Sequence, residues 1–235
     1  GKTTTYSYDD NRNMVSMTDP VGLTTAYEYD ANNRLKKVIQ PGGATTQYSY
    51  DSAGRLATET DALGRVTTYQ YDSAGRLLTV QYPNGAVYTY QYDANGNQTG
   101  VTDPLNRTTL TTYDALNRIS TTADPLNHVT TQIYDAASRL IQRKNAANQS
   151  LFYGYDAADR MTSFTDALGR VTQYGYDAAG NSTSTTNPLG QVSTTVYDAL
   201  NRPVQLIDVA GNTTQYVYDA VGQQTQVIQP TGATT

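Results

Sequence analysis

The chain of 235 residues contains no cysteine, no tryptophan, two phenylalanines and one histidine. Without cysteine it can form no disulfide, no thiolate metal site and no cysteine nucleophile. With His128 as its only histidine, it can build neither a multi-histidine metal cluster nor a Ser-His-Asp triad in more than one place. We therefore expect His128 to occupy a solvated face.

Long apolar runs and a basic surface are also lacking. No apolar stretch approaches the roughly 18 residues of a transmembrane helix, and the first residues lack a signal-peptide profile. The net charge is −5, with the Lys and Arg residues spread along the chain, so we expect no nucleic-acid partner and no membrane span.

Tyrosine and threonine are abundant instead. The chain has 21 tyrosines, and Thr and Tyr both suit the pleated surface of a strand. Hydrophobic residues make up only 37% of the chain, which leaves little material for a conventional core. The composition therefore predicts a thin, all-β structure.

A Tyr-Asp pair recurs every 21 residues, in eleven copies without insertion or deletion. Such a period is typical of a repeat array, in which a residue that recurs is more useful for structure than for catalysis. The chain begins and ends within a copy, so we interpret residues 1–235 as one array, uncapped at both ends and excerpted from a longer protein. The tyrosines of the pairs, to which we assign structural roles, are Tyr8, Tyr29, Tyr50, Tyr71, Tyr92, Tyr113, Tyr134, Tyr155, Tyr176, Tyr197 and Tyr218.

Each copy contains two turn signals. The first starts at the Asp of the pair, for example Asp51 or Asp72, which can accept hydrogen bonds from the turn's own amides. Three residues later stands Gly or Asn in eight of eleven copies, with Arg12, Ser138 and Asp159 as exceptions. In the second turn the fourth residue is always Gly or Asn, as a left-handed backbone requires. The glycines of this column are Gly22, Gly43, Gly64, Gly85, Gly169, Gly190, Gly211 and Gly232.

Two turns per copy predict 22 short antiparallel strands in one continuous sheet of β-hairpins. Because neighbouring strands twist, we expect this sheet to curl into a spiral wall. Side chains alternate faces with period two, whereas the repeat is odd, so identical turns would put the tyrosines of successive copies on opposite faces. Either the two connections differ, or a β-bulge recurs in the shorter strand or beside the second turn.

Chemical readings of the repeated residues are weaker than structural ones. The Asp column could bind calcium, but each Asp has a turn to cap and usually an Arg close by. Glu59 and Asp61 are spaced for glycosidase chemistry, yet no sequence feature indicates a pocket around them. We therefore predict no enzyme activity, no metal site and no cofactor. Rows of Tyr could instead stack on sugars, which leaves carbohydrate as a possible partner.

The stretches 50–56 (YDSAGRL) and 61–72 (DALGRVTTYQYD) resemble the YD repeat of the Rhs family, and the resemblance extends over essentially the whole chain. That family includes BC components of insecticidal Tc toxins, bacterial wall-associated proteins and teneurins. The resemblance implies a hollow shell of β-hairpins that, in toxin members, encloses a C-terminal toxic polypeptide. The self-cleaving aspartyl core of those members has no counterpart in this chain.

From this resemblance we expect a structural shell segment of a secreted or surface-exposed bacterial protein. Its partner would be an enclosed or fused polypeptide such as a toxin, or neighbouring repeats of the same protein. The alternative is an extracellular array or fibre that binds glycans or a cell surface through outward-facing tyrosine rows.

Overall fold

The computed structural model describes residues 3–230, so Gly232, one of the predicted turn glycines, lies outside the described residues. These residues form 22 strands, and none of them belongs to a helix that could cross a membrane. The strands that lead into the Tyr-Asp pairs are β1 (Thr5–Tyr8), β3 (Thr24–Tyr29), β5 (Thr45–Tyr50), β7 (Val66–Tyr71), β9 (Val87–Tyr92), β11 (Thr108–Tyr113), β13 (Val129–Tyr134), β15 (Ser150–Tyr155), β17 (Val171–Tyr176), β19 (Val192–Tyr197) and β21 (Thr213–Tyr218). The strands that follow the pairs are β2 (Met14–Thr18), β4 (Leu35–Ile39), β6 (Leu56–Thr60), β8 (Leu77–Gln81), β10 (Gln98–Thr102), β12 (Ile119–Ala123), β14 (Leu140–Lys144), β16 (Met161–Thr165), β18 (Ser182–Thr186), β20 (Pro203–Ile207) and β22 (Gln224–Ile228).

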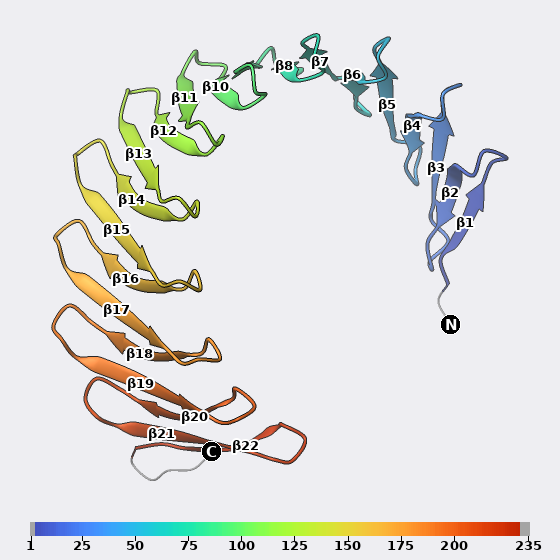
Figure 1. The fold of residues 1–235 in the computed structure, drawn as a ribbon. Coiled ribbons are helices and arrows are strands. Elements are labelled where there is room, and N and C mark those ends of the chain that lie inside the picture. Colours follow the sequence, from blue (N-terminus) through green and yellow to red (C-terminus); the bar gives the residue numbers. More distant parts are fainter. Residues whose placement is uncertain (1–2, 231–235) are drawn as a thin grey trace. The chain divides into compact units, whose positions relative to one another are not determined.

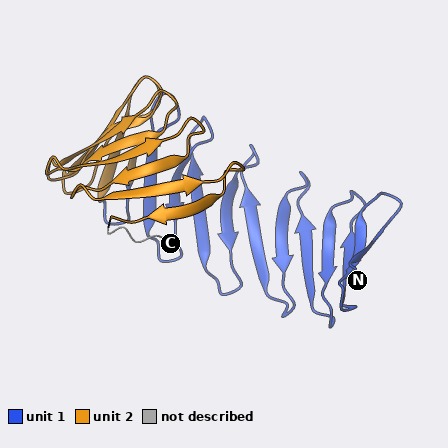
Figure 2. Ribbon diagram, turned by 90° about the horizontal axis from the view of Figure 1, so that it is seen from below, with its two compact units in different colours: residues 1–118, 123–127 blue, residues 119–122, 128–235 orange. Residues whose placement is uncertain are grey.

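The chain divides into two compact units, residues 1–118 with 123–127 and residues 119–122 with 128–235 (Figure 2). In the first unit each strand from β1 to β11 pairs antiparallel with the next. In the second unit the same holds from β13 to β22. Each unit is a curved strip of consecutive hairpins (Figure 1), which confirms the predicted all-β repeat fold.

Both turns of a copy have the same geometry. In the first turn the amide of Asp51 donates to the carbonyl of Arg55 at 2.9 Å, and the amide of Gly54 donates to the carbonyl of Asp51 at 3.0 Å. The second turn repeats these bonds between Asp61 and Arg65 and between Gly64 and Asp61, at 3.0 and 2.9 Å. This is a type I turn closed by a residue in the left-handed region.

The left-handed position has positive φ whether or not it holds glycine. Gly54 and Gly64 have φ of 82° and 76°. The three residues that departed from the Gly or Asn pattern, Arg12, Ser138 and Asp159, adopt φ of 67°, 67° and 62°. The turn therefore imposes its backbone conformation even on side chains that disfavour it.

A β-bulge recurs beside the first turn. Tyr50 pairs with Leu56 and Ser49 pairs with Thr58, so Ala57 has no partner in the ladder. The same register shift occurs in the other Tyr-Asp hairpins of β1–β10 and β13–β22. Since the two turns are alike, this bulge compensates for the odd repeat length, because one residue per copy is left out of the pairing and the same columns stay on the same face. It lies in the shorter strand, as one alternative proposed, but next to the first turn and not the second.

The bulge keeps all tyrosine rows on one side of the strip. Tyr48 pairs with Glu59, and Glu59 pairs with Thr67, so these three side chains lie on the same side of the sheet. Tyr69 and Tyr71 lie two and four residues after Thr67 in the same strand and therefore project from that side as well. We call this side the tyrosine face. The other side, the polar face, carries Ser, Thr and Gln in most copies, and pairs such as the hydroxyls of Ser49 and Thr58 bond across it at 2.6 Å.

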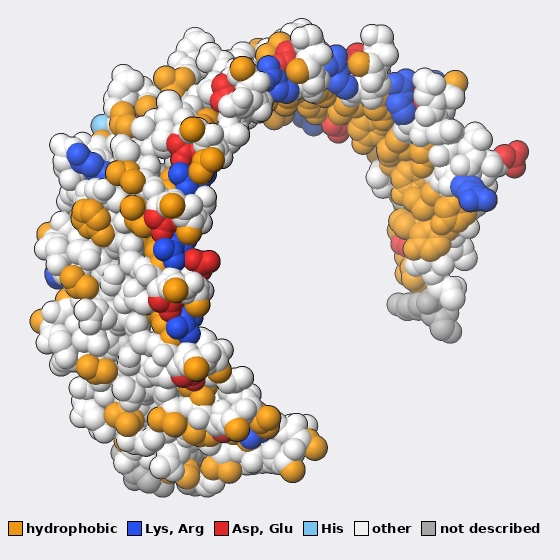
Figure 3. Space-filling model, viewed as in Figure 1, with side chains coloured by type: hydrophobic (Ala, Val, Ile, Leu, Met, Phe, Trp, Pro, Cys, Tyr) orange, Lys and Arg blue, Asp and Glu red, His pale blue; other side chains and the backbone are white. Residues whose placement is uncertain are grey.

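The strip has a single layer and almost no core. Val80 is the one buried hydrophobic residue in the described chain, at 5% exposure, and Thr25 is the one buried polar residue, at 8%. In the first unit, hydrophobic side chains gather on the inner side of the unit's own curve (Figure 3). Stability must therefore come from the ladder, the turns and contacts between neighbouring copies.

Candidate functional site

The aspartate of the Tyr-Asp pair caps its own turn. The Oδ1 atom of Asp51 accepts from the amides of Ala53 and Arg55, both at 2.9 Å, and its Oδ2 accepts from Arg55 Nε at 2.7 Å. Asp72 holds the same contacts with Ala74 and Arg76. The carboxylate thus satisfies turn amides that strand pairing leaves free.

The arginine of each turn then reaches forward to the next copy. The Nη1 atom of Arg55 donates to the carbonyl of Asp72 at 2.9 Å, and its guanidinium lies 4.8 Å from the ring centroid of Tyr71. The arginine therefore contacts both residues of the next Tyr-Asp pair, the ring of the tyrosine and the backbone carbonyl of the aspartate. The same stacking joins Arg34 to Tyr50, Arg76 to Tyr92, Arg139 to Tyr155, Arg160 to Tyr176 and Arg202 to Tyr218, at 4.5 to 5.1 Å.

The tyrosine of each pair reaches backward. The hydroxyl of Tyr50 donates to the carbonyl of Leu35, fifteen residues earlier, at 2.7 Å. Further hydroxyls that make the equivalent bond are those of Tyr29, Tyr113, Tyr155, Tyr176, Tyr197 and Tyr218. Arginine and tyrosine therefore tie neighbouring copies together in both directions along the edge formed by the first turns, which we call the Tyr-Asp edge.

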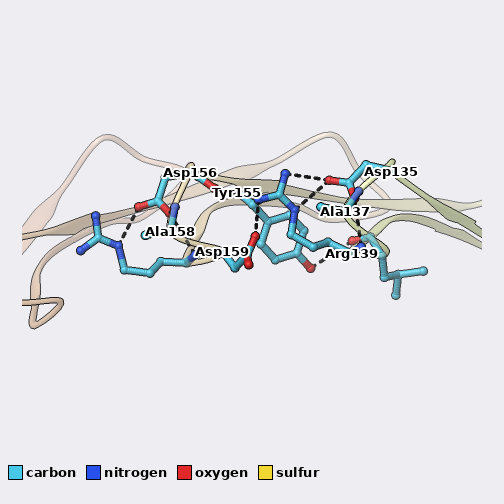
Figure 4. A network of polar contacts seen from close by, with 9 residues as sticks. Asp135, Ala137, Arg139, Tyr155, Asp156, Ala158 and Asp159 are labelled. Carbon is cyan, nitrogen blue, oxygen red and sulfur yellow. Dashed lines mark hydrogen bonds and ion pairs between the residues drawn. The ribbon is translucent and has the colours of Figure 1, made fainter.

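Figure 4 shows this network where it is densest. Arg139 bonds to its own Asp135 at 2.8 Å and to the carbonyl of Asp156 in the next copy at 2.7 Å. It also forms an ion pair with Asp159, which occupies the left-handed turn position of that copy, at 2.8 Å. An acidic residue in a position that usually holds Gly or Asn thus pairs with the arginine of the preceding copy.

Asparagine replaces arginine in three copies, and its partner changes with it. Asn97 bonds to its own Asp93 at 3.0 Å and to the Oδ1 atom of Asn117, the left-handed residue of the next copy, at 2.8 Å. Asn13 with Asn33 and Asn181 with Asn201 repeat this arrangement at 2.9 and 2.8 Å. In three other copies an arginine lies over glycine, as Arg34 does over Gly54, where an added Cβ would be 3.3 Å from Nη1. Both columns are visible in the sequence, so their covariation is a signal that our sequence analysis missed.

The second turns form the opposite edge, where arginine stays within its own turn. Arg65, Arg107 and Arg170 each pair with the turn aspartate at 2.6 Å. Their side chains are 61–62% exposed, against 22–32% for the paired arginines of the Tyr-Asp edge. In residues 3–230 these three arginines make no hydrogen bond to a neighbouring copy.

Hydrogen bonding holds the aspartates in their charged form on both edges. The backbone amide of Arg55 and its side chain lower the pKa of Asp51 below its usual value, against a smaller opposing effect of burial. Arg76 lowers the pKa of Asp72 and Arg65 that of Asp61 in the same way. Where the partner is Asn97, its side-chain amide is the main cause of the lowered pKa of Asp93.

Glu59 and Asp61 line a cavity of about 830 Å³, although no sequence feature indicates a pocket around them. The sequence could not reveal it because part of its wall, including Tyr82 and Tyr88, comes from the next copy. Asp61 is held by the amides of its turn and by Arg65, so it is not placed as a second catalytic carboxylate.

The structure also places His128 and the aspartates that we considered as calcium ligands. His128 is exposed at a second turn. No group of three or more His, Asp or Glu side chains placed to hold a metal ion occurs within residues 3–230. Each aspartate that we considered for calcium is occupied by its own turn, as described for Asp51 and Asp72.

Comparisons with known proteins find two repeat families and structures of Tc toxin proteins. The family model of the teneurin YD-shell matches residues 1–161, and that of the RHS repeat matches residues 153–192 and 197–234. The crystal structure of TcdB2-TccC3 without its hypervariable C-terminal region matches with a TM-score of 0.53 at 14% identity, over 96% of this chain and 15% of that one. The Tc holotoxin pore of Photorhabdus luminescens matches with a TM-score of 0.56 at 16% identity, over the same shares. The chain thus spans 15% of the length of these proteins, and a search of curated proteins finds no match.

Proposed function

Because this chain belongs to the teneurin YD-shell and RHS-repeat family, we propose that it is a wall segment that encloses or scaffolds another polypeptide in a secreted or surface-exposed bacterial protein. A toxin is one such polypeptide. The observation that carries the proposal is the difference between the two sides of a single-layered strip. Tyr, Met and Leu side chains line one side, and no second layer of residues 3–230 covers them.

The tyrosine face suits contact with a polypeptide. Its residues are mostly half-buried by their neighbours along the strip, and a further layer would bury apolar area worth about 25 cal/mol per Å². The polar face differs, because hydroxyl pairs such as Thr18 with Thr24, at 2.7 Å, satisfy each other across the ladder. A wall with one apolar and one polar side can separate an enclosed chain from water.

We do not extend the proposal to glycan binding by the Tyr-Asp row. Several of its rings are covered by a guanidinium, as Tyr50 is by Arg34, and several hydroxyls are bonded to a backbone carbonyl. These tyrosines are therefore largely engaged within the array, and enclosure is the function that the contacts favour.

Hydroxyl-radical labelling of the full-length protein tests enclosure, with the 235-residue chain alone as the reference. Met17 and Met161 lie on the tyrosine face and oxidise readily, whereas Phe152 and Val196 are exposed on the polar face. Enclosure predicts that the two methionines are protected only in the full-length protein and that Phe152 and Val196 label equally in both. Equal labelling of the methionines in the two samples would reject enclosure by this face.

A further inference from the structure

The repeat is interrupted at three positions that belong to neighbouring copies. Glu59 stands in a column that is otherwise mainly aliphatic, Tyr82 in a column of Asp, Asn and Gln, and Tyr88 in a column that is mainly Thr. An array built from near-identical copies has no structural need for these three exceptions. The residues one copy earlier are Val38, Asp61 and Thr67.

These three exceptions line one cavity, that of about 830 Å³ on the tyrosine face. Strand register brings them together, because Glu59 pairs with Thr67 while Val80 pairs with both Tyr69 and Tyr88. Tyr82 follows directly after β8. The rings of Tyr82 and Tyr88 are 5.9 Å apart at 81° and so form two walls that meet nearly at a right angle.

Glu59 gives this cavity a net negative charge. Asp61 is neutralised by Arg65 at 2.6 Å, and the other glutamate of the chain, Glu28, is paired with Lys37 at 3.4 Å. Glu59 forms no ion pair within residues 3–230, and its closest polar contact is the hydroxyl of Tyr69 at 3.5 Å. A half-buried carboxylate without a cationic partner attracts a cation from solution.

The tyrosines contribute electron-rich ring faces. Burial raises the pKa of Tyr69, and the carboxylate of Glu59 raises it further. Its phenol therefore stays protonated at physiological pH, and the same holds for Tyr48, whose pKa is raised by burial and by Glu59. Neutral aromatic faces next to a carboxylate are the surroundings that organic cations prefer.

We propose that the cavity lined by Glu59, Tyr69, Tyr82 and Tyr88 binds a small organic cation, such as a quaternary or alkyl ammonium group. The head group would sit against the tyrosine rings, with Glu59 as its counter-ion. A neutral sugar could use the same aromatic walls, but it would leave the charge of Glu59 unbalanced. This inference does not depend on what the wall encloses.

The second unit contains a natural control. Its corresponding cavity, of about 230 Å³, is lined by Arg143, Asn145 and Leu151. The second cavity lies four copies later, so Arg143 stands in the place of Glu59 and Leu151 in the place of Thr67, while the residues at the places of Tyr82 and Tyr88 are Asp166 and Thr172. The sign of the charge is reversed and an aromatic wall is missing, so this second cavity should not take an organic cation.

The test is a titration of the 235-residue protein with choline, followed through the ring resonances of its tyrosines by NMR. The uncharged isostere 3,3-dimethyl-1-butanol and methyl glucoside are titrated in parallel. We expect saturable choline binding that is about tenfold tighter than that of the isostere, because only choline gains the cation–π contact and the counter-ion; tenfold corresponds to about 1.4 kcal/mol.

Variants that restore the residues of other copies locate the site without disturbing the fold. Glu59→Val and Tyr88→Thr should each weaken choline binding about tenfold, whereas Arg143→Val should leave it unchanged. Melting curves confirm that each variant is folded. The proposal is overturned if choline binding does not saturate, if the isostere or methyl glucoside binds as tightly as choline, or if folded Glu59→Val retains full affinity for choline.

Discussion

The two edges of the strip have the same turn but different connections between copies. On the Tyr-Asp edge, Arg55 contacts its own turn, the next backbone and the next aromatic ring. On the opposite edge, the side chain of Arg65 hydrogen-bonds only to Asp61 among residues 3–230 and is twice as exposed. An exposed ion pair contributes little on its own. The comparison teaches that, beyond the strand ladder, the side-chain contacts that join one copy to the next are those that leave a turn, whereas the caps inside each turn are common to both edges.

Acid should remove the caps on both edges and have the largest effect. The pKa values of Asp72 and Asp61 are lowered in the folded protein, so their contribution is complete above the unfolded value of about 3.9 and is lost as the pH falls through the folded values. Because most copies carry such aspartates, the urea midpoint should fall steeply between about pH 4 and pH 2. A midpoint that is constant over this range would contradict the capping role.

Valine in the left-handed turn position should destabilise the protein more on the Tyr-Asp edge than on the opposite edge. Gly64→Val should cost about 1–3 kcal/mol because a β-branched residue is strained at positive φ, whereas Thr67→Val, in a neighbouring strand, should cost little. Gly54→Val should cost about 0.5–1 kcal/mol more than Gly64→Val, since its Cβ would meet Arg34 and displace it from Tyr50. Thermal unfolding measures all three. Equal melting temperatures for Gly64→Val and Thr67→Val would refute the turn geometry.

Removing one arginine from each edge tests the connections directly. Arg55→Ala should destabilise the protein by about 2 kcal/mol, because it loses a charged hydrogen bond to the backbone and a cation–π contact. Arg65→Ala should cost under about 1 kcal/mol. Urea unfolding of both variants provides the measurement. If the two losses are the same, the forward contact of Arg55 contributes nothing.

The smallest effect concerns the tyrosine hydroxyl. Tyr50→Phe removes the bond to the carbonyl of Leu35 and should cost about 0.5–1.5 kcal/mol. Tyr71→Phe is the matched control, since the hydroxyl of Tyr71 makes no hydrogen bond within residues 3–230, and its unfolding free energy should hardly change. A larger loss for Tyr71→Phe than for Tyr50→Phe would reverse this order.

Much of the fold could be predicted from the sequence because it is local. Gly64 and its equivalents mark left-handed turn positions, and Tyr69 with Tyr71 mark one face of a strand. The odd repeat length implied either two different connections or a recurrent bulge, and two placements of the bulge fitted. The structure places it at Ala57 and its equivalents, beside the first turn. The choice depends on which strand leaves one residue unpaired in the ladder, and strand propensity does not determine that.

The candidate sites could be predicted less well. We paired each arginine with the aspartate of its own turn, which is four residues away, but not with the tyrosine ring sixteen residues ahead. We also found no sign of a pocket around Glu59 and Asp61, because the walls contributed by Tyr82 and Tyr88 belong to the next copy. Each miss involves residues that are distant in the sequence and adjacent only once the strands have paired.

The sequence alone determined the turns, the strands and the shared side of the two tyrosines within a copy, because each follows from backbone preferences within a few residues. The tertiary structure alone decided which arginine covers which ring, which copy's asparagine meets the next, and where three departures from the repeat enclose a cavity. Those contacts depend on register across the sheet, and a one-residue change of register would separate all of them.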